Sequence, residues 1–119
     1  MSENIKFQDN VVEVITEEDI KEEYKHVKLS KVYRFEGKEI SELDMSGIFD
    51  LCVEDMIAAQ KMINADGTVT VLPEMDVGYC MNIAARACKM PVEFFRKTLN
   101  MKDGITIKSK VTSFFFGEE

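Results

Sequence analysis

Polar and apolar residues alternate in the segment that begins at Val27. One side of this alternation consists of Val27, Leu29, Lys31, Tyr33 and Phe35, and a period of two is typical of a half-buried β-strand. A turn at residues 36–38 precedes a second extended stretch around Ile40, so the pattern predicts a β-hairpin. Because two strands bury too little surface to be stable alone, this hairpin should pack on the segments that follow it.

Three segments after the hairpin have apolar residues at helical spacing. The stripe of the first, which ends before a turn at 64–67, consists of Cys52, Met56, Ala59 and Ile63, widened by Val53 and Ile57. The second segment opens with Pro73, which suits a first helical turn, and its stripe consists of Val77, Cys80, Met81, Ala84, Ala87 and Cys88. The third follows Pro91 and has Val92, Phe95 and Leu99 on one side. The second stripe is the clearest and predicts the central helix of the core.

The last segment, residues 105–116, fits two structures. Ile105, Ile107, Val111 and Phe115 share one side of a strand, whereas Ile107, Val111, Phe114 and Phe115 fit a helical stripe equally well. The β-branched residues locally favour the strand. Periodicity alone does not decide between strand and helix.

Residues 1–26 carry most of the excess negative charge. They hold eight acidic and three basic residues, whereas residues 27–119 hold 14 acidic and 12 basic ones. Residues 11–15 predict a short strand, and a capping-box pattern at 16–19 predicts a helix that ends near Tyr24. We therefore expect an acidic, partly mobile N-terminal extension over 1–26, with ordering against a partner as the alternative. A single domain is expected over 27–119.

The length, composition and net charge of the chain exclude several classes of protein. A chain of 119 residues with 45% hydrophobic residues should form one compact domain. The predicted fold class is α+β, mainly α, with an N-terminal β-hairpin packed on a small bundle of three to four helices. No apolar run approaches the roughly 20 residues that span a bilayer, and a net charge of −7 is opposite to what phosphate binding requires. Neither a membrane nor a nucleic acid is an expected partner.

The side chains needed for catalysis or metal binding form no recognisable pattern. The one histidine, His26, has no nucleophile at a known motif, and the three cysteines lack a Cys-x-x-Cys pair. Cys80 and Cys88 would stand roughly 12 Å apart on a helix, too far to share one zinc ion. A calcium loop over 62–73 would need carboxylates at its two ends, where a methionine and a proline stand. We therefore predict a protein that is not an enzyme, with no catalytic residue, cofactor or metal ligand.

Apolar residues that cannot all reach one core are the candidates for partner binding. The adjacent Phe114, Phe115 and Phe116 cannot all face inward, so at least one should be exposed or covered by another chain. Eight methionines are many for this length, and their soft side chains suit surfaces that bind several shapes. The methionines predicted as surface positions are Met45, Met62, Met75, Met90 and Met101.

Six short segments between residues 27 and 116 occur in a particular order. They read Val-Lys-Leu-Ser at 27–30, Arg-Phe-Glu-Gly-Lys at 34–38, Ser-Glu-Leu-Asp-Met-Ser-Gly at 41–47, Val-Glu-Asp-Met-Ile-Ala-Ala at 53–59, Ala-Ala-Arg-Ala at 84–87 and Met-Pro-Val-Glu-Phe-Phe at 90–95. In this order and spacing, the chain resembles the small tail assembly chaperones of long-tailed bacteriophages and prophages, the group of the tail protein E and protein 41 type. The resemblance implies a helical last segment and no catalytic residue.

The resemblance also implies a role. Such a chaperone binds the tape-measure protein, keeps its apolar helices soluble and releases it as tail tube subunits polymerise around it. A ribosomal frameshift near the end of the gene, for which the codons of residues 114–116 are the place to look, would give a longer product of the same gene as a further partner. Self-association stays open. The expected location is the cytoplasm of the bacterial host, with no place in the mature virion. The alternative is a small acidic phage-encoded module that binds or inhibits a host protein.

Overall fold

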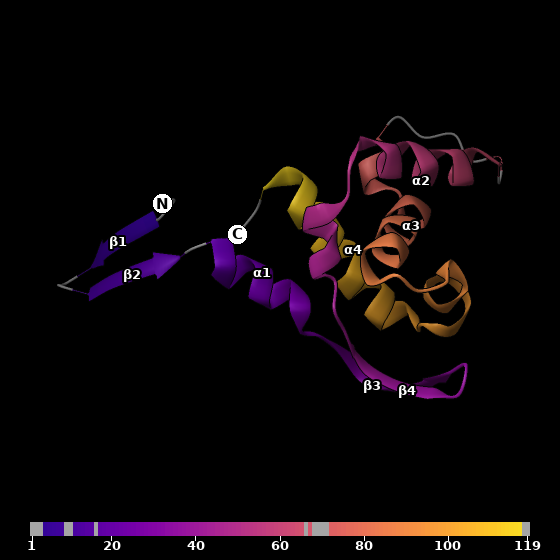
Figure 1. Ribbon diagram of the computed structural model, residues 1–119, viewed down its shortest axis with the longest axis horizontal. Helices are drawn as coiled ribbons and strands as arrows, with labels where there is room; N and C mark the ends of the chain where they lie inside the picture. Colours follow the sequence, from indigo (N-terminus) through magenta and orange to yellow (C-terminus); the bar gives the residue numbers. More distant parts are fainter. Residues whose placement is uncertain (1–3, 9–10, 16, 66, 68–71, 118–119) are drawn as a thin grey trace.

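Two β-hairpins and a set of helices make up the fold (Figure 1). The computed structural model describes residues 4–8, 11–15, 17–65, 67 and 72–117. In chain order the elements are β1 (Asn4–Gln8), β2 (Val11–Ile15), α1 (Glu17–Lys25), β3 (Val27–Phe35), β4 (Lys38–Leu43), the 3₁₀ helix η1 (Ser46–Asp50), α2 (Val53–Ala65), the 3₁₀ helix η2 (Pro73–Met75), α3 (Val77–Cys88), the π-helical turn η3 (Phe94–Thr98) and α4 (Met101–Phe116). The predicted α+β class, mainly α, with a hairpin followed by several helices, is confirmed.

The predicted hairpin is formed by β3 and β4. Its two-residue turn places Glu36 and Gly37 at positive φ angles of 51° and 79°, the geometry that matches the twist of two antiparallel strands. The register shifts between Lys28 and Tyr33, and this irregularity interrupts the strict alternation along β3. Val27 and Tyr33 are buried as the alternation predicts, while Lys31, which lies within the irregular stretch, is exposed.

Helix α3 is the central core helix that the sequence predicts. Its buried residues are Tyr79, Cys80, Met81, Asn82, Ile83, Ala84, Ala85 and Ala87. The predicted start at Pro73 is wrong, because Pro73 opens the separate η2 turn and Asp76 caps α3 by accepting a hydrogen bond from the Tyr79 N–H at 2.9 Å. Val77, predicted in the buried stripe, lies in the exposed first turn of α3.

Helix α2 packs on α3 along a narrow strip (Figure 1). Ala59 and Ile63 are buried and Met56 is partly buried, as the stripe predicts, whereas Cys52, predicted as its first member, is exposed and precedes the helix. The predicted widening of that stripe is wrong, because Val53 and Ile57 are exposed. The physical reason is that α2 lies at the edge of the bundle, where it has a neighbour on one side and solvent on the other. The spacing of apolar residues along the sequence does not distinguish those of α2 that are exposed from those that are buried.

The segment after Pro91 is shorter and wider than an α-helix. In η3 the Leu99 N–H donates to the Phe94 carbonyl oxygen at 2.9 Å, the five-residue spacing of a π turn. Phe94 and Phe95 are both buried, whereas the predicted stripe included only Phe95, with Leu99 at its end. The wide turn allows two adjacent aromatic residues to face the core, a result that a period of 3.6 does not predict.

The ambiguous last segment is helical. Asn100 caps α4 by accepting a hydrogen bond from the Asp103 N–H at 2.8 Å, and Gly117 ends the helix with a φ of 68°. Ile107 and Val111 are fully buried, while Ile105 faces solvent. The helical stripe and the helix implied by the resemblance are therefore confirmed, and the preference for a strand from β-branching is wrong, because tertiary contacts outweigh local propensity.

The predicted strand at 11–15 and the helix to about Tyr24 are confirmed as β2 and α1, and β1 is an addition that the sequence did not indicate. The β1–β2 hairpin lies at one end of the molecule, next to α1 and away from α2 and α3 (Figure 1). Tyr24 is buried against Phe49, with ring centroids 5.3 Å apart, so the core begins before Val27. The partial mobility expected for residues 1–26 stays a prediction.

No helix in the part of the chain that the structure describes is long and apolar enough to cross a membrane.

Candidate binding surface

The start of α4 is fixed to β3 by a buried carboxylate. Asp103, only 2% exposed, accepts hydrogen bonds from the Ser30 N–H at 2.9 Å, the Ser30 hydroxyl at 2.9 Å and the Tyr33 hydroxyl at 2.6 Å. The Tyr33 oxygen in turn accepts from the Asn100 N–H at 3.1 Å. We call these four residues the Asp103 network. It joins a strand to a helix about 70 residues later and determines which way α4 is rotated.

The network also sets the protonation of its members. Burial by itself would raise the pKa of Asp103, but the hydrogen bonds from Tyr33 and Ser30 outweigh it and lower that pKa below its ordinary value. Burial, followed by the hydrogen bond to the carboxylate, raises the pKa of Tyr33. At neutral pH the carboxylate is therefore ionised and the phenol keeps its proton.

An apolar groove lies between the first turns of α3 and α4. It has a volume of about 360 Å³, and we call it the α3–α4 groove. Its lining residues are Val77, Gly78, Met81, Phe95, Arg96, Leu99, Asn100, Met101, Gly104 and Ile105. Met101 is 84% exposed and Ile105 is 68% exposed, which is unusual for side chains of this size. Arg96 is the only charged residue in the lining.

The predicted candidates Phe114, Phe115 and Phe116 have two different roles. The ring of Phe114 lies 5.2 Å from that of Phe49, and the ring of Phe115 lies 6.1 Å from that of Tyr79. These two close the last turn of α4 against the body, while Phe116 is 54% exposed. The exposure expected of at least one of the three is confirmed by Phe116. Their binding of a partner stays a prediction.

A second apolar hollow adjoins Phe114 and Phe115. It has a volume of about 310 Å³ and lies between η1, the start of α2 and the end of α4. Its lining residues are Ile48, Leu51, Cys52, Val53, Met56, Ile83, Phe114 and Phe115. The two hollows thus lie near opposite ends of α4.

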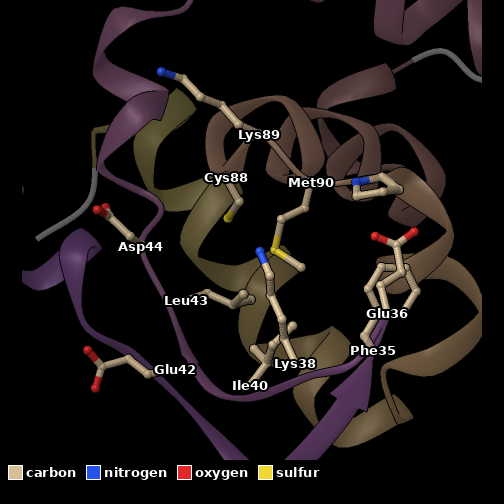
Figure 2. A pocket seen from close by; sticks show the side chains of 11 residues that line it. Phe35, Glu36, Lys38, Ile40, Glu42, Leu43, Asp44, Cys88, Lys89 and Met90 are labelled. Atoms are coloured by element: carbon tan, nitrogen blue, oxygen red, sulfur yellow. The ribbon is translucent and has the colours of Figure 1, made fainter.

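A third hollow, of about 330 Å³, separates the β3–β4 hairpin from the end of α3 (Figure 2). Figure 2 shows Cys88 and Met90 pointing toward Leu43 and Ile40, whereas Lys89 points away. Burial raises the pKa of the Cys88 thiol to about 12, so it stays protonated and is a poor nucleophile. The charged residues at its rim are of both signs and give no preference for an anion or a cation.

The remaining polar candidates have structural partners. His26 is exposed, and its Nδ1 lies 2.6 Å from Glu42 and its Nε2 lies 3.3 Å from Glu22, which ties the end of α1 to β4. Cys80 is buried and its thiol donates to the Glu74 carbonyl oxygen at 3.3 Å, while Cys52 is exposed. Among the described residues, no three His, Cys, Asp or Glu side chains are placed to hold a metal ion.

Sequence reasoning missed the α3–α4 groove as a unit. Among the methionines predicted as surface positions, Met101 is exposed in the groove, Met75 is exposed in η2 and Met62 is exposed on α2. Met45 is fully buried and Met90 is partly buried against the core, so a surface position is wrong for Met45 and only partly right for Met90. The usable signal was the pair Met101 and Ile105, which lies four residues apart and outside the stripe of Ile107 and Val111.

Comparison of the chain with protein-family models, with curated proteins and with solved structures finds no match.

Proposed function

We propose that this protein is a phage or prophage tail assembly chaperone that binds the tape-measure protein. The proposal starts from the order of sequence segments that resembles this family. The structural observation that supports it is the exposed apolar rim of the α3–α4 groove, where the side chains of Met101, Ile105 and Val77 are exposed to solvent. A large apolar patch on a small protein is typical of a surface that binds another chain.

Such a surface is suited to a protein that binds a partner without catalysing a reaction. A chaperone that binds only the unassembled tape-measure protein lowers the free concentration of its apolar helices and so opposes their aggregation. Tail tube subunits then displace the chaperone as they polymerise around the same helices, which requires only modest affinity at each site. The net charge of −7 favours solubility of the complex.

Further partners follow from the same proposal. A longer frameshift product that shares this domain would contact the tape-measure protein through its extension, while the short form joins the complex through the shared domain. Phe116 and the hollow beside Phe114 and Phe115 offer a second apolar contact for such an assembly, or for a second copy. The protein would act in the cytoplasm of the bacterial host and be absent from the mature virion.

The test is co-expression with the tape-measure protein encoded in the same phage or prophage genome. We expect the soluble fraction of that protein to rise several-fold and the two chains to co-purify. Ile105→Glu, which places a charge in the groove, should abolish both effects. Ile57→Glu, which changes the same residue type at another exposed position, on α2, is the matched control and should leave them intact. A tape-measure protein that stays insoluble with the short form, the long form and both together would refute the proposal.

A further inference from the structure

The segment on the α4 side of the α3–α4 groove differs in the sign of its net charge from the whole chain. Residues 89–110, which contain η3 and most of α4, hold six basic and two acidic residues, a formal +4 in a chain whose total is −7. One of the two acids is Asp103, whose carboxylate is buried and occupied by the Asp103 network. The α4 side of the groove is therefore basic, whereas Glu74 and Asp76 lie just before Val77 on its α3 side.

Several of these basic side chains are available to a partner. Lys97 and Lys102 are exposed and Lys108 is half-buried. In the described part of the chain, none of these three forms an ion pair with an acidic side chain, whereas Lys110 lies 4.0 Å from Glu23 on α1. Glu23 of α1 thus lies at a different lysine, so the exposed side chains of Lys97 and Lys102 can meet the carboxylates of a partner.

The outward face of α4 has the spacing that matches another helix. Met101, Ile105, Lys108 and Thr112 recur at intervals of four, three and four residues, so they form one stripe along the helix. The apolar pair lies at the groove, and Lys108 follows it at the next turn, close enough to Cys80 of α3 to act on it electrostatically. The groove, with about 360 Å³, has room for two or three apolar side chains of a helix lying across it.

We propose that the α3–α4 groove binds an acidic amphipathic helix, whose apolar side chains enter the groove between Val77 and Ile105 and whose carboxylates meet Lys97, Lys102 and Lys108. Helices bind such grooves through apolar anchors at i, i+3, i+4 and i+7, and complementary charge at the rim selects the partner and accelerates its association. The inference rests on the proposed function in one respect: the tape-measure protein is the chain that supplies the helix.

The experiment measures binding of two fluorescently labelled 20-residue peptides to the full-length protein by anisotropy. The peptides share apolar residues at i, i+3, i+4 and i+7, and they differ in carrying either glutamates or lysines at the flanking positions. We expect the acidic peptide to bind at least tenfold more tightly than the basic one. This preference should shrink as the salt concentration rises from 50 to 500 mM, because the charges involved are exposed.

Two sets of variants locate the interaction. The double variant Lys102→Glu with Lys108→Glu should reverse the preference between the peptides, whereas Lys28→Glu with Lys61→Glu, at exposed positions on β3 and α2, should preserve it. Ile105→Glu should weaken both peptides by at least tenfold. Equal thermal midpoints among the variants exclude unfolding as the cause, and a variant that melts early is replaced by the corresponding Lys→Gln change.

Three results would overturn the proposal. The first is equal binding of the two peptides or tighter binding of the basic one. The second is an unchanged preference in the variant altered at Lys102 and Lys108. The third is a stable dimer in sedimentation equilibrium that Ile105→Glu dissociates, because a second copy would then fill the groove. If the acidic peptide binds as expected but the tape-measure protein stays insoluble, the groove chemistry holds and the tail-assembly role fails.

Discussion

Replacing Asp103 by alanine should destabilise the protein by about 3 kcal/mol. The carboxylate is buried and accepts three hydrogen bonds, two from Ser30 and one from the Tyr33 hydroxyl. Ser30 is exposed, so water can replace the carboxylate as the hydrogen-bond acceptor for its N–H and its hydroxyl. Each of these two bonds therefore contributes roughly 0.5–1 kcal/mol. The Tyr33 hydroxyl cannot donate to water instead, because Tyr33 is itself buried. An unpaired buried donor costs about 1–3 kcal/mol. The sum is a large part of the roughly 5–15 kcal/mol that stabilises a domain of this size.

The assay is urea unfolding followed by far-ultraviolet circular dichroism. Tyr33→Phe removes the other side of the shortest bond and should cost about 1–2 kcal/mol, since the Asn100 N–H also loses its acceptor. Because the two residues share one bond, the double variant should be at least about 1 kcal/mol less destabilised than the sum of the single variants. Asp103→Asn, which keeps the size of the side chain and some of its acceptor capacity, should fall between alanine and the parent.

The network also has a defined pH dependence. The pKa of Asp103 is lowered in the folded protein from its ordinary value of 3.8. Its stabilising contribution is therefore fully present above that value and is lost as the pH falls through the lower pKa of the folded state. The difference between parent and Asp103→Ala should be constant from pH 5 to pH 7 and decrease below pH 4. A difference under about 0.5 kcal/mol at pH 7, or strict additivity with Tyr33→Phe, would refute the reasoning.

Three further predictions concern the core, the histidine and the thiols. Ala84→Asp should cost several kcal/mol, because it buries an unpaired charge in α3, and a thermal midpoint within two degrees of the parent, which would be under about 1 kcal/mol, would contradict this. The hydrogen bond to Glu42 raises the pKa of His26, so its stabilising effect should be complete at low pH and lost as the pH rises through the raised pKa. Glu42→Gln should lower the His26 pKa measured by proton NMR, and an unchanged titration would exclude the contact. Native protein treated with iodoacetamide at pH 8 should lose one thiol per chain, the exposed Cys52, since burial raises the pKa of Cys80 to about 11. Equal alkylation of all three cysteines, seen by mass spectrometry, would show that the helices do not shield them.

Local features of the chain were predictable from the sequence because they depend on nearby residues. Alternation with period two defined β3, and the turn after it was indicated by Gly37, which accepts a positive φ angle. The central helix α3 was evident because it is surrounded by neighbours, so most of its apolar positions are buried and only Val77, in its first turn, is an exposed member of the predicted stripe. In each case the residues that form the sequence pattern are the same residues that form the strand, turn or helix.

Features that depend on distant residues were decided by the tertiary structure. Residues 105–116 fit a strand and a helix equally well, and the packing of Ile107 and Val111 in the core, together with the Asn100 cap, selected the helix. Asp103 looked like an ordinary charged residue until the fold brought Ser30 and Tyr33 to it across about 70 positions. The α3–α4 groove arises in the same way, from segments that are far apart in sequence. Apolar spacing shows which residues can be buried, but only the neighbours placed by the fold determine which are covered and which, like Met101, remain in water.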